Sequence, residues 1–279
     1  METSPAPQRQ VRLTEFAPVP ELDVAAYERL ARSVRILFGI DLSRYRPAQV
    51  WRRVNGFAAA RGLPNPDALV AKARHDDALR QAFVDMLTIN VSEFFRNPEA
   101  WDSLAERFLG PMLRSHTTVR IWSAGCSLGY EPFSLAMLAR ELAPATTARI
   151  LATDLDETIL SRARAATYSE AQMAGVSKAR RARFFRPRED KWVVRPELQA
   201  LVTFRRHDLL HDPYEHSFDL IVCRNVVIYF TEEAKLEMYR RFSEALRHDG
   251  VLFLGATESI LSTGPIGLTA AGFSFYRRP

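Results

Sequence analysis

The sequence has little cysteine. Only Cys126 and Cys223 occur among its 279 residues, far apart and each within an apolar stretch. Two isolated thiols exclude the disulfide framework of a small secreted domain and indicate reduced, packed cysteines in a reducing compartment. A catalytic thiol is also disfavoured, because neither cysteine has a histidine partner at a recognisable spacing.

Long apolar runs are missing as well. The opening residues, METSPAPQRQ, contain no apolar signal core. No run approaches the roughly 18 consecutive apolar residues that a membrane-spanning helix requires. We therefore expect a cytoplasmic protein that does not insert into a membrane.

No charge of one sign dominates, because 38 Lys and Arg oppose 33 Asp and Glu. Electrostatic function must therefore depend on where charge is concentrated. Positive charge gathers near the N-terminus, at Arg29, Arg32, Arg35, Arg44, Arg46, Arg52, Arg53 and Arg61. These arginines form either an ordinary solvated face or a docking surface for an acidic partner. No zinc finger, recognition-helix signature or aromatic–basic interleaving favours nucleic acid.

The first third of the chain has the periodicity of helices. Residues 1–20 contain four prolines and no sustained pattern, so we predict a loose N-terminal arm. Within residues 21–95 apolar side chains repeat at helical spacing, as at Tyr27, Leu30 and Val34, which predicts a small all-helical domain. Asn97 and Pro98 then form a start signal for a connecting helix.

Residues 96–279 have the pattern of an α/β domain. Short apolar strands, including VRIWSA, ARILATD, FDLIVCRNV and VLFLG, alternate with helical segments. This alternation is typical of a parallel sheet. It is interrupted at about 182–206, where WVV and LVTF are predicted to form a small antiparallel insertion.

A glycine turn follows the first predicted strand. Gly125 and Gly129 allow a nucleotide-like ligand to approach the backbone at the carboxyl end of that strand. Asp154 ends the next strand, where an acidic residue commonly binds ribose hydroxyls. Asp156 is predicted to cap the following helix. The pattern indicates an adenosine-type ligand, and a dinucleotide and S-adenosylmethionine fit it equally well.

One cluster has metal-like composition, formed by His207, Asp208, His211, Asp212 and His216. Pro213 interrupts the helix that would bring these side chains together, so we predict no metal site.

Four motifs follow one another in order: NVSEFFR at 90–96, WSAGCSLGYEPFSLAM at 122–137, ATDLD at 152–156 and CRNVVIYF at 223–230. Together with GATES at 255–259 they resemble the CheR-type chemotaxis-receptor methyltransferases. The resemblance implies an α/β fold, with a Rossmann-like S-adenosylmethionine-dependent methyltransferase domain, a small inserted antiparallel β-subdomain and a preceding all-α N-terminal domain.

The same resemblance implies a function. The family transfers the methyl group of S-adenosylmethionine to glutamate side chains on the cytoplasmic methylation helices of chemoreceptors, giving glutamyl methyl esters and S-adenosylhomocysteine. A glutamate is ionised at neutral pH, so this reaction requires no general base. We expect a monomer that docks the acidic receptor helices through Arg46, Arg52 and Arg53.

The matched motifs imply which residues of this sequence form the site. Cofactor contacts fall on Asn90, Ser92, Arg96, Gly125, Glu131, Asp154, Asp208, Asn225 and Val226. Glu131 suits the ammonium group of the cofactor, and Arg96 suits either the cofactor's carboxylate or the substrate's. Asp208 is expected near the adenine amino group. Arg96 and Tyr229 are predicted to orient the reacting carboxylate, although an aromatic core role for Tyr229 stays open.

The motifs depart from the family pattern at four positions. Ser92 and Leu128 replace threonines, Tyr130 replaces the first glutamate of the glycine turn, and Asp208 replaces an asparagine. Leu128 and Tyr130 leave an alternative open, a cofactor-binding regulatory or scaffold protein with little transfer activity. The segment around Trp192 also lacks the glycine-centred loop expected for gripping a receptor's C-terminal pentapeptide, which favours recognition without a tether.

Overall fold

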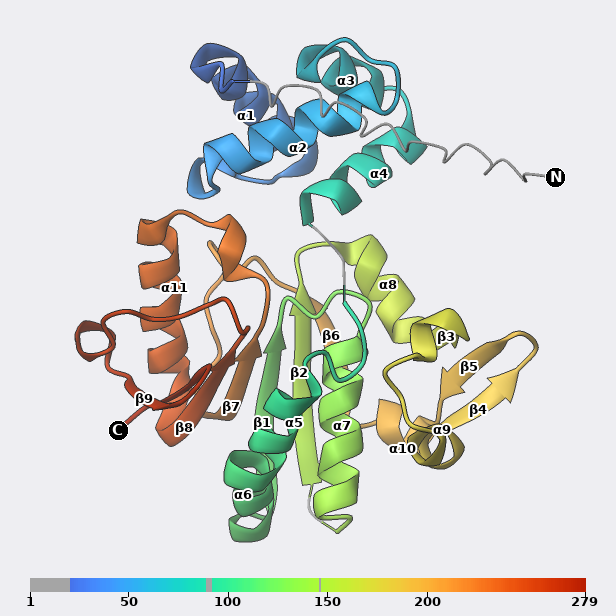
Figure 1. Ribbon diagram of the computed structural model, residues 1–279, viewed down its shortest axis with the longest axis vertical. Coiled ribbons are helices and arrows are strands. Elements are labelled where there is room, and N and C mark those ends of the chain that lie inside the picture. Colours follow the sequence, from blue (N-terminus) through green and yellow to red (C-terminus); the bar gives the residue numbers. More distant parts are fainter. Residues whose placement is uncertain (1–20, 89–91, 146) are drawn as a thin grey trace, which may run out of the picture.

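The computed structural model describes residues 21–88, 92–145 and 147–279. The arm predicted at 1–20 and the site residue Asn90 lie outside these ranges. A bundle of short helices lies above an α/β domain, and a small sheet projects from one side of that domain (Figure 1). None of the helices in the described ranges is long and apolar enough to cross a membrane.

The N-terminal bundle has its own core. Its helices are α1 (Val24–Phe38), α2 (Pro47–Ala59), α3 (Pro66–Ala73) and α4 (Asp77–Thr88). They begin where the sequence supplies caps, since Asp23 accepts a hydrogen bond from the Ala26 N–H and Asn65 accepts one from the Ala68 N–H. Leu30, Val34 and Phe83 are fully buried between the helices. This packing of apolar stripes, rather than helix propensity, stabilises the bundle.

The central sheet of the α/β domain has the order β6-β2-β1-β7-β8-β10-β9. Its strands are β1 (Thr118–Ala124), β2 (Thr147–Asp154), β6 (Val202–Arg206), β7 (Phe218–Cys223), β8 (Leu246–Leu254), β9 (Thr269–Gly272) and β10 (Phe275–Arg277). The first five in this order along the sheet are parallel, while β10 pairs antiparallel with both β8 and β9. The sheet therefore follows a doubly wound order that reverses direction between β1 and β7, where such sheets bind ligands.

Helices cover both faces of this sheet. They are α5 (Pro98–Leu104), α6 (Gly110–Ser115), α7 (Tyr130–Leu142), α8 (Glu157–Ala165) and α11 (Glu232–Ala245). Ile121 and Trp122 are neighbours on β1 and enter opposite cores, the first with Phe133 of α7 and the second with Phe242 of α11. Burial on both faces explains why the strands are continuous apolar runs.

The inserted subdomain starts earlier and ends earlier than the sequence predicted. Its sheet has the order β3-β5-β4 and consists of β3 (Thr167–Ser169), β4 (Phe185–Arg188) and β5 (Lys191–Val194), with α9 (Lys178–Phe184) between β3 and β4. The predicted span of 182–206 was wrong at its end, because LVTF contributes β6, which pairs parallel with β2. The helix between β5 and β6 is α10 (Pro196–Gln199). It is too short to show a helical periodicity in the sequence, so the sequence did not indicate that a helix connects β5 to the parallel strand β6.

The helical bundle contacts the carboxyl ends of the parallel strands at two places. The Arg46 N–H donates to the Tyr229 carbonyl at 3.0 Å and the Thr231 N–H donates to the Arg44 carbonyl at 2.9 Å, beyond the end of β7. On the other side, Gln81 of α4 donates to Asp156, just beyond the end of β2. The bundle therefore bridges the sheet edge where the doubly wound order reverses.

Candidate functional site

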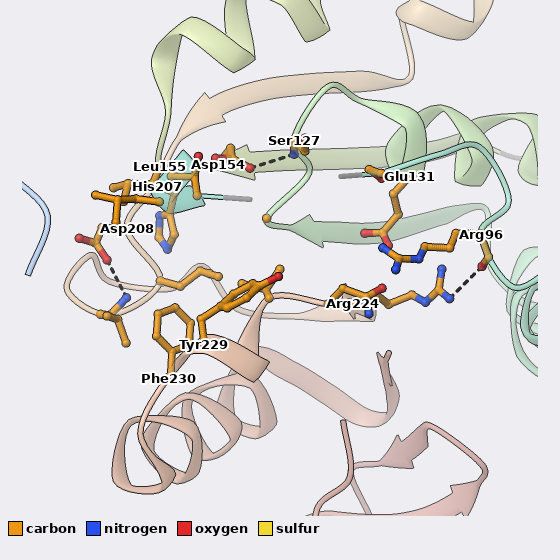
Figure 2. Close-up of a pocket in the computed structure, with 18 of the residues that line it drawn as sticks. Arg96, Ser127, Glu131, Asp154, Leu155, His207, Asp208, Arg224, Tyr229 and Phe230 are labelled. Carbon is orange, nitrogen blue, oxygen red and sulfur yellow. Dashed lines mark hydrogen bonds between the residues drawn. The ribbon is translucent and has the colours of Figure 1, made fainter. Parts of the chain in front are cut away.

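A cavity lies between these two contacts, at the carboxyl ends of β1, β2 and β7. The predicted docking arginines do not line it, whereas the predicted cofactor-binding and catalytic residues that the structure describes all do: Ser92, Arg96, Gly125, Glu131, Asp154, Asp208, Asn225, Val226 and Tyr229. Figure 2 shows two polar ends, with Glu131, Arg96 and Arg224 at one and Asp154, His207 and Asp208 at the other. Tyr45 adds a wall from the helical bundle.

The glycine turn forms part of the cavity wall. The N–H groups of Gly125 and Cys126 both donate to the Thr153 carbonyl, at 2.8 and 2.9 Å. Gly125 has a φ of +79°, and a Cβ placed on it would lie 2.4 Å from a methyl group of Val226. Only glycine allows the turn after β1 to approach the loop after β7 this closely.

Asp154 is oriented by two hydrogen bonds at one polar end of the cavity. Its carboxylate accepts hydrogen bonds from the Ser127 N–H at 2.8 Å and from the Asp156 N–H at 3.1 Å. Burial raises the pKa of Asp154, and these two hydrogen bonds oppose the rise. Each oxygen retains acceptor capacity, so the oriented carboxylate is able to bind a diol. Asp156 caps α8 through the Thr158 N–H, as predicted.

Glu131 and Arg224 define the opposite end. Glu131 accepts a hydrogen bond from the Ser123 hydroxyl at 2.8 Å. Burial raises the pKa of Glu131 to about 7, against the attraction of the Arg224 guanidinium. Arg224 is buried and its Nε has no partner among the described residues. A half-buried carboxyl beside a buried guanidinium suits a zwitterionic ligand.

Arg224 is a site residue that the sequence reasoning missed, although it stands in the CRNVVIYF motif. Its guanidinium donates to the Arg96 carbonyl at 2.8 Å and to the Asn97 side-chain oxygen at 3.0 Å. The helix α5 begins at Pro98, as the Asn97–Pro98 start signal predicted, but the Asn97 side chain does not cap it. Asn97 has a φ of 59° and makes no capping bond, because its amide instead binds Arg224. Arg224 thus connects the loop after β7 to the Arg96 loop.

Glu258 shapes the loop after β7 from beneath. Its carboxylate accepts hydrogen bonds from the N–H groups of Asn225 and Gly255, both at 2.7 Å, and of Val227 at 3.0 Å. Asn225 has a φ of 61°, a left-handed conformation that this carboxylate holds in place. The sequence identified GATES as a motif, but only the structure assigns Glu258 this positioning role.

Tyr229 lies at the rim of the cavity. It is half-buried, and burial raises the pKa of its hydroxyl. The Arg53 guanidinium lies 5.8 Å from the centre of its ring. A small adjoining cavity is lined by Tyr45, Arg53 and Tyr229. Tyr229 is therefore an accessible rim residue rather than an aromatic core residue.

The three predicted docking arginines occupy different environments. Arg46 forms an ion pair with Glu232 of α11, and Arg53 donates to the Met86 carbonyl as well as facing Tyr229. Arg52 is exposed and forms no ion pair with any described residue. Arg52 is thus the most accessible of the three, while Arg53 belongs to the rim of the cavity.

The His207–His216 segment makes local contacts. Asp208 accepts a hydrogen bond from the Leu210 N–H at 2.8 Å and contacts His211 at 2.9 Å, so its side chain shapes its own loop. His207 is buried against Trp122 and Tyr214, and this burial lowers its pKa. Within the described ranges, no group of three His, Cys, Asp or Glu side chains is arranged to hold a metal ion.

The polar groups of the cavity fit S-adenosylmethionine. The Asp154 carboxylate suits ribose hydroxyls, and Glu131 beside the Arg224 guanidinium suits an amino-acid end group. A nicotinamide dinucleotide has no zwitterionic end to match Glu131 and Arg224. The pair of Glu131 and Arg224 therefore favours S-adenosylmethionine over a dinucleotide, two ligands that the glycine turn alone fits equally well.

This sheet order and this cavity define the class of Rossmann-like methyltransferases that use S-adenosylmethionine. A family model described as "CheR methyltransferase, SAM binding domain" matches residues 90–268, and one described as "CheR methyltransferase, all-alpha domain" matches residues 25–88. The chain belongs to the CheR methyltransferase family, and its cofactor is S-adenosylmethionine.

Chemotaxis protein methyltransferases from several bacteria are similar in sequence to this chain over most of their length. A chemotaxis protein methyltransferase of Listeria monocytogenes is 40% identical over 92% of this chain and 98% of its own. Chemotaxis protein methyltransferase 1 of Pseudomonas aeruginosa is 34% identical over 80% of this chain and 85% of its own. That of Salmonella typhimurium is 32% identical over 85% of each chain. The similarity spans both the helical bundle and the α/β domain.

Proposed function

We propose that the protein transfers the methyl group of S-adenosylmethionine to glutamate side chains of chemoreceptor-like proteins, giving glutamyl methyl esters and S-adenosylhomocysteine. The observation that carries this proposal is the rim of the cofactor cavity. Arg96 and Tyr229 both line the cavity, the Arg96 charge opposes the rise in the pKa of the Tyr229 hydroxyl, and Arg53 faces the Tyr229 ring. Cations and a hydroxyl at the entrance suit an anionic nucleophile that is already ionised.

The chain's own residues bind and position the reactants. Asp154 receives the ribose hydroxyls, while Glu131 and Arg224 receive the ammonium and carboxylate groups of the methionine end. S-adenosylmethionine supplies an electrophilic methyl group on its sulfonium. Since Arg224 is buried at this end, Arg96 is left to orient the incoming glutamate carboxylate together with Tyr229.

Orientation matters more than charge at this step. The glutamate carboxylate and the sulfonium both lose their charge in the transition state, so a tight ion pair with Arg96 stabilises the reactants more than the transition state. Placing the carboxylate oxygen about 3 Å from the methyl carbon is the productive contribution. The bundle contributes Tyr45 to the cavity wall, and an apolar wall there reduces the access of water to the reacting groups.

The alternative function, a scaffold protein with little transfer activity, depends on Leu128 and Tyr130. Neither side chain lines the cofactor cavity in the described part of the chain. The Tyr130 ring packs against Phe94 and Tyr168 at centroid distances of 4.9 and 5.1 Å, behind the turn. These two departures therefore alter the packing behind the turn rather than the lining of the cavity, which favours an active enzyme.

Labelled-methyl transfer tests the proposal. Purified protein is incubated with methyl-labelled S-adenosylmethionine and receptor-containing membranes, and the labelled protein is then treated with mild alkali. We expect the label to be released as methanol, because a glutamyl methyl ester hydrolyses whereas an N-methyl group does not. Label that survives alkali would contradict ester formation. Tight S-adenosylhomocysteine binding without transfer to any receptor would support the scaffold.

A further inference from the structure

A second cavity lies behind the glycine turn, between α8 and the β3 edge of the inserted sheet, elements that adjoin in Figure 1. We call it the rear cavity. It is lined by Leu128, Arg162, Thr167, Ser169, Gln172 and Lys191, and its volume is about 260 Å³. Among the described residues it shares no lining residue with the cofactor cavity. It is thus a separate site on the other side of the same turn.

The rear cavity has two cations without acidic partners. Arg162 and Lys191 form no ion pair with any carboxylate in the described ranges. Nearby arginines do: Arg164 pairs with Glu157, and Arg181 pairs with Glu170. The positive charges that no described carboxylate neutralises, those of Arg162 and Lys191, therefore lie at the rear cavity.

Acidic groups near the cavity point elsewhere. Glu170 follows Ser169 directly, but its carboxylate is bound by Arg181 and by the Trp192 indole N–H at 2.7 Å. The Ser169 side chain lines the cavity, and its hydroxyl makes no hydrogen bond to another described residue. An anion in the cavity would meet two cations and a hydroxyl donor, with no carboxylate directed at it.

Tyr130 explains why this charge is unbalanced. The family pattern has a glutamate at this position, and here the Tyr130 hydroxyl instead accepts a hydrogen bond from Gln172 at 2.6 Å. Arg162 is near enough to this hydroxyl to oppose the rise in its pKa. A glutamate side chain at position 130 would place a carboxylate near Arg162, and the tyrosine removes that neutralising charge.

We propose that the rear cavity binds a small anion carrying a phosphate group, held by Arg162, Lys191 and the Ser169 hydroxyl. A guanidinium fork and a lysine ammonium are the side chains that bind phosphate oxygens best. The cavity is smaller than the roughly 300–1,000 Å³ typical of sites for drug-sized ligands, which favours a small anion over a peptide. This site goes beyond methyl transfer and does not depend on it.

Calorimetry on protein saturated with S-adenosylhomocysteine tests the site, because the cofactor cavity is then closed to the probe. Pyrophosphate is titrated into the wild type and into Arg162→Gln and Lys191→Gln. We expect saturable binding to the wild type and a loss of at least about tenfold in affinity in each variant. Arg164→Gln is the matched control, since it removes the same charge from the same helix outside the cavity, and we expect less than about a twofold change.

Three results would overturn the proposal. The first is a dissociation constant for wild-type protein weaker than about 10 mM. The second is an equal loss in Arg164→Gln, which would indicate general electrostatic attraction. The third is tighter binding of glutarate, a dicarboxylate probe, than of pyrophosphate.

Discussion

Glu131 is expected to make cofactor affinity depend on pH near neutrality. Burial raises its pKa to about 7 in the protein without ligand. The ammonium group of the cofactor requires the ionised carboxylate, so only the ionised fraction binds well. That fraction rises from about one-tenth at pH 6 to about nine-tenths at pH 8, and the affinity for S-adenosylhomocysteine should rise roughly tenfold over this range.

Folding stability should change in the opposite direction. In the unfolded chain Glu131 ionises near 4.5, whereas in the folded protein it keeps its proton up to about pH 7. Its contribution to the free energy of unfolding is therefore complete below pH 4.5 and is lost as pH rises through 7. The difference in pKa corresponds to roughly 3 kcal/mol.

Glu131→Gln separates these effects. The amide oxygen still accepts from Ser123 but cannot ionise, so at pH 8 the ligand-free variant should melt at a higher temperature than the wild type. Its affinity for S-adenosylhomocysteine should fall by about 10- to 150-fold, the equivalent of a charged hydrogen bond worth 1.5 to 3 kcal/mol. Calorimetry from pH 6 to 8 and thermal melts measure both. Wild-type affinity that is flat with pH, or a variant that keeps the wild-type slope, would refute the reasoning.

Three further predictions concern the rim, the docking face and the turn. Tyr229→Phe should lower kcat for receptor methylation about 10-fold or more while S-adenosylhomocysteine affinity stays within about twofold, and a large change in that affinity would place Tyr229 in cofactor binding. Arg52→Ala should slow methylation of receptor membranes and flatten its decline with salt, without changing the melting temperature; a wild-type salt response would make Arg52 only a solvated residue. Gly125→Ala should cost about 1–3 kcal/mol of stability and weaken the cofactor, because its Cβ would clash with Val226; normal melting and affinity would contradict the close approach of the two loops.

The sequence motifs named nine residues that the fold brings together around one cavity. Motif spacing placed Gly125, Asp154 and Asn225 at or just beyond the ends of three strands, and the carboxyl ends of parallel strands meet at one edge of a sheet. The helical bundle and the alternating strands were also visible, because periodicity is a local property of the chain.

Tertiary structure decided what depends on contacts between distant segments. Arg224 joins the Arg96 loop across 128 positions, and Glu258 holds Asn225 across 33. The apolar segment LVTF is compatible with a strand of an antiparallel hairpin and with a parallel strand at the edge of the main sheet. Only its parallel pairing with β2 shows which of the two it forms. Arg46, Arg52 and Arg53 look equivalent in sequence, yet Arg46 pairs with Glu232, Arg53 faces the Tyr229 ring and Arg52 stays exposed. The role of each of these arginines depends on the residue that the fold places beside it. That neighbour is distant in the sequence, so the local sequence pattern does not identify it.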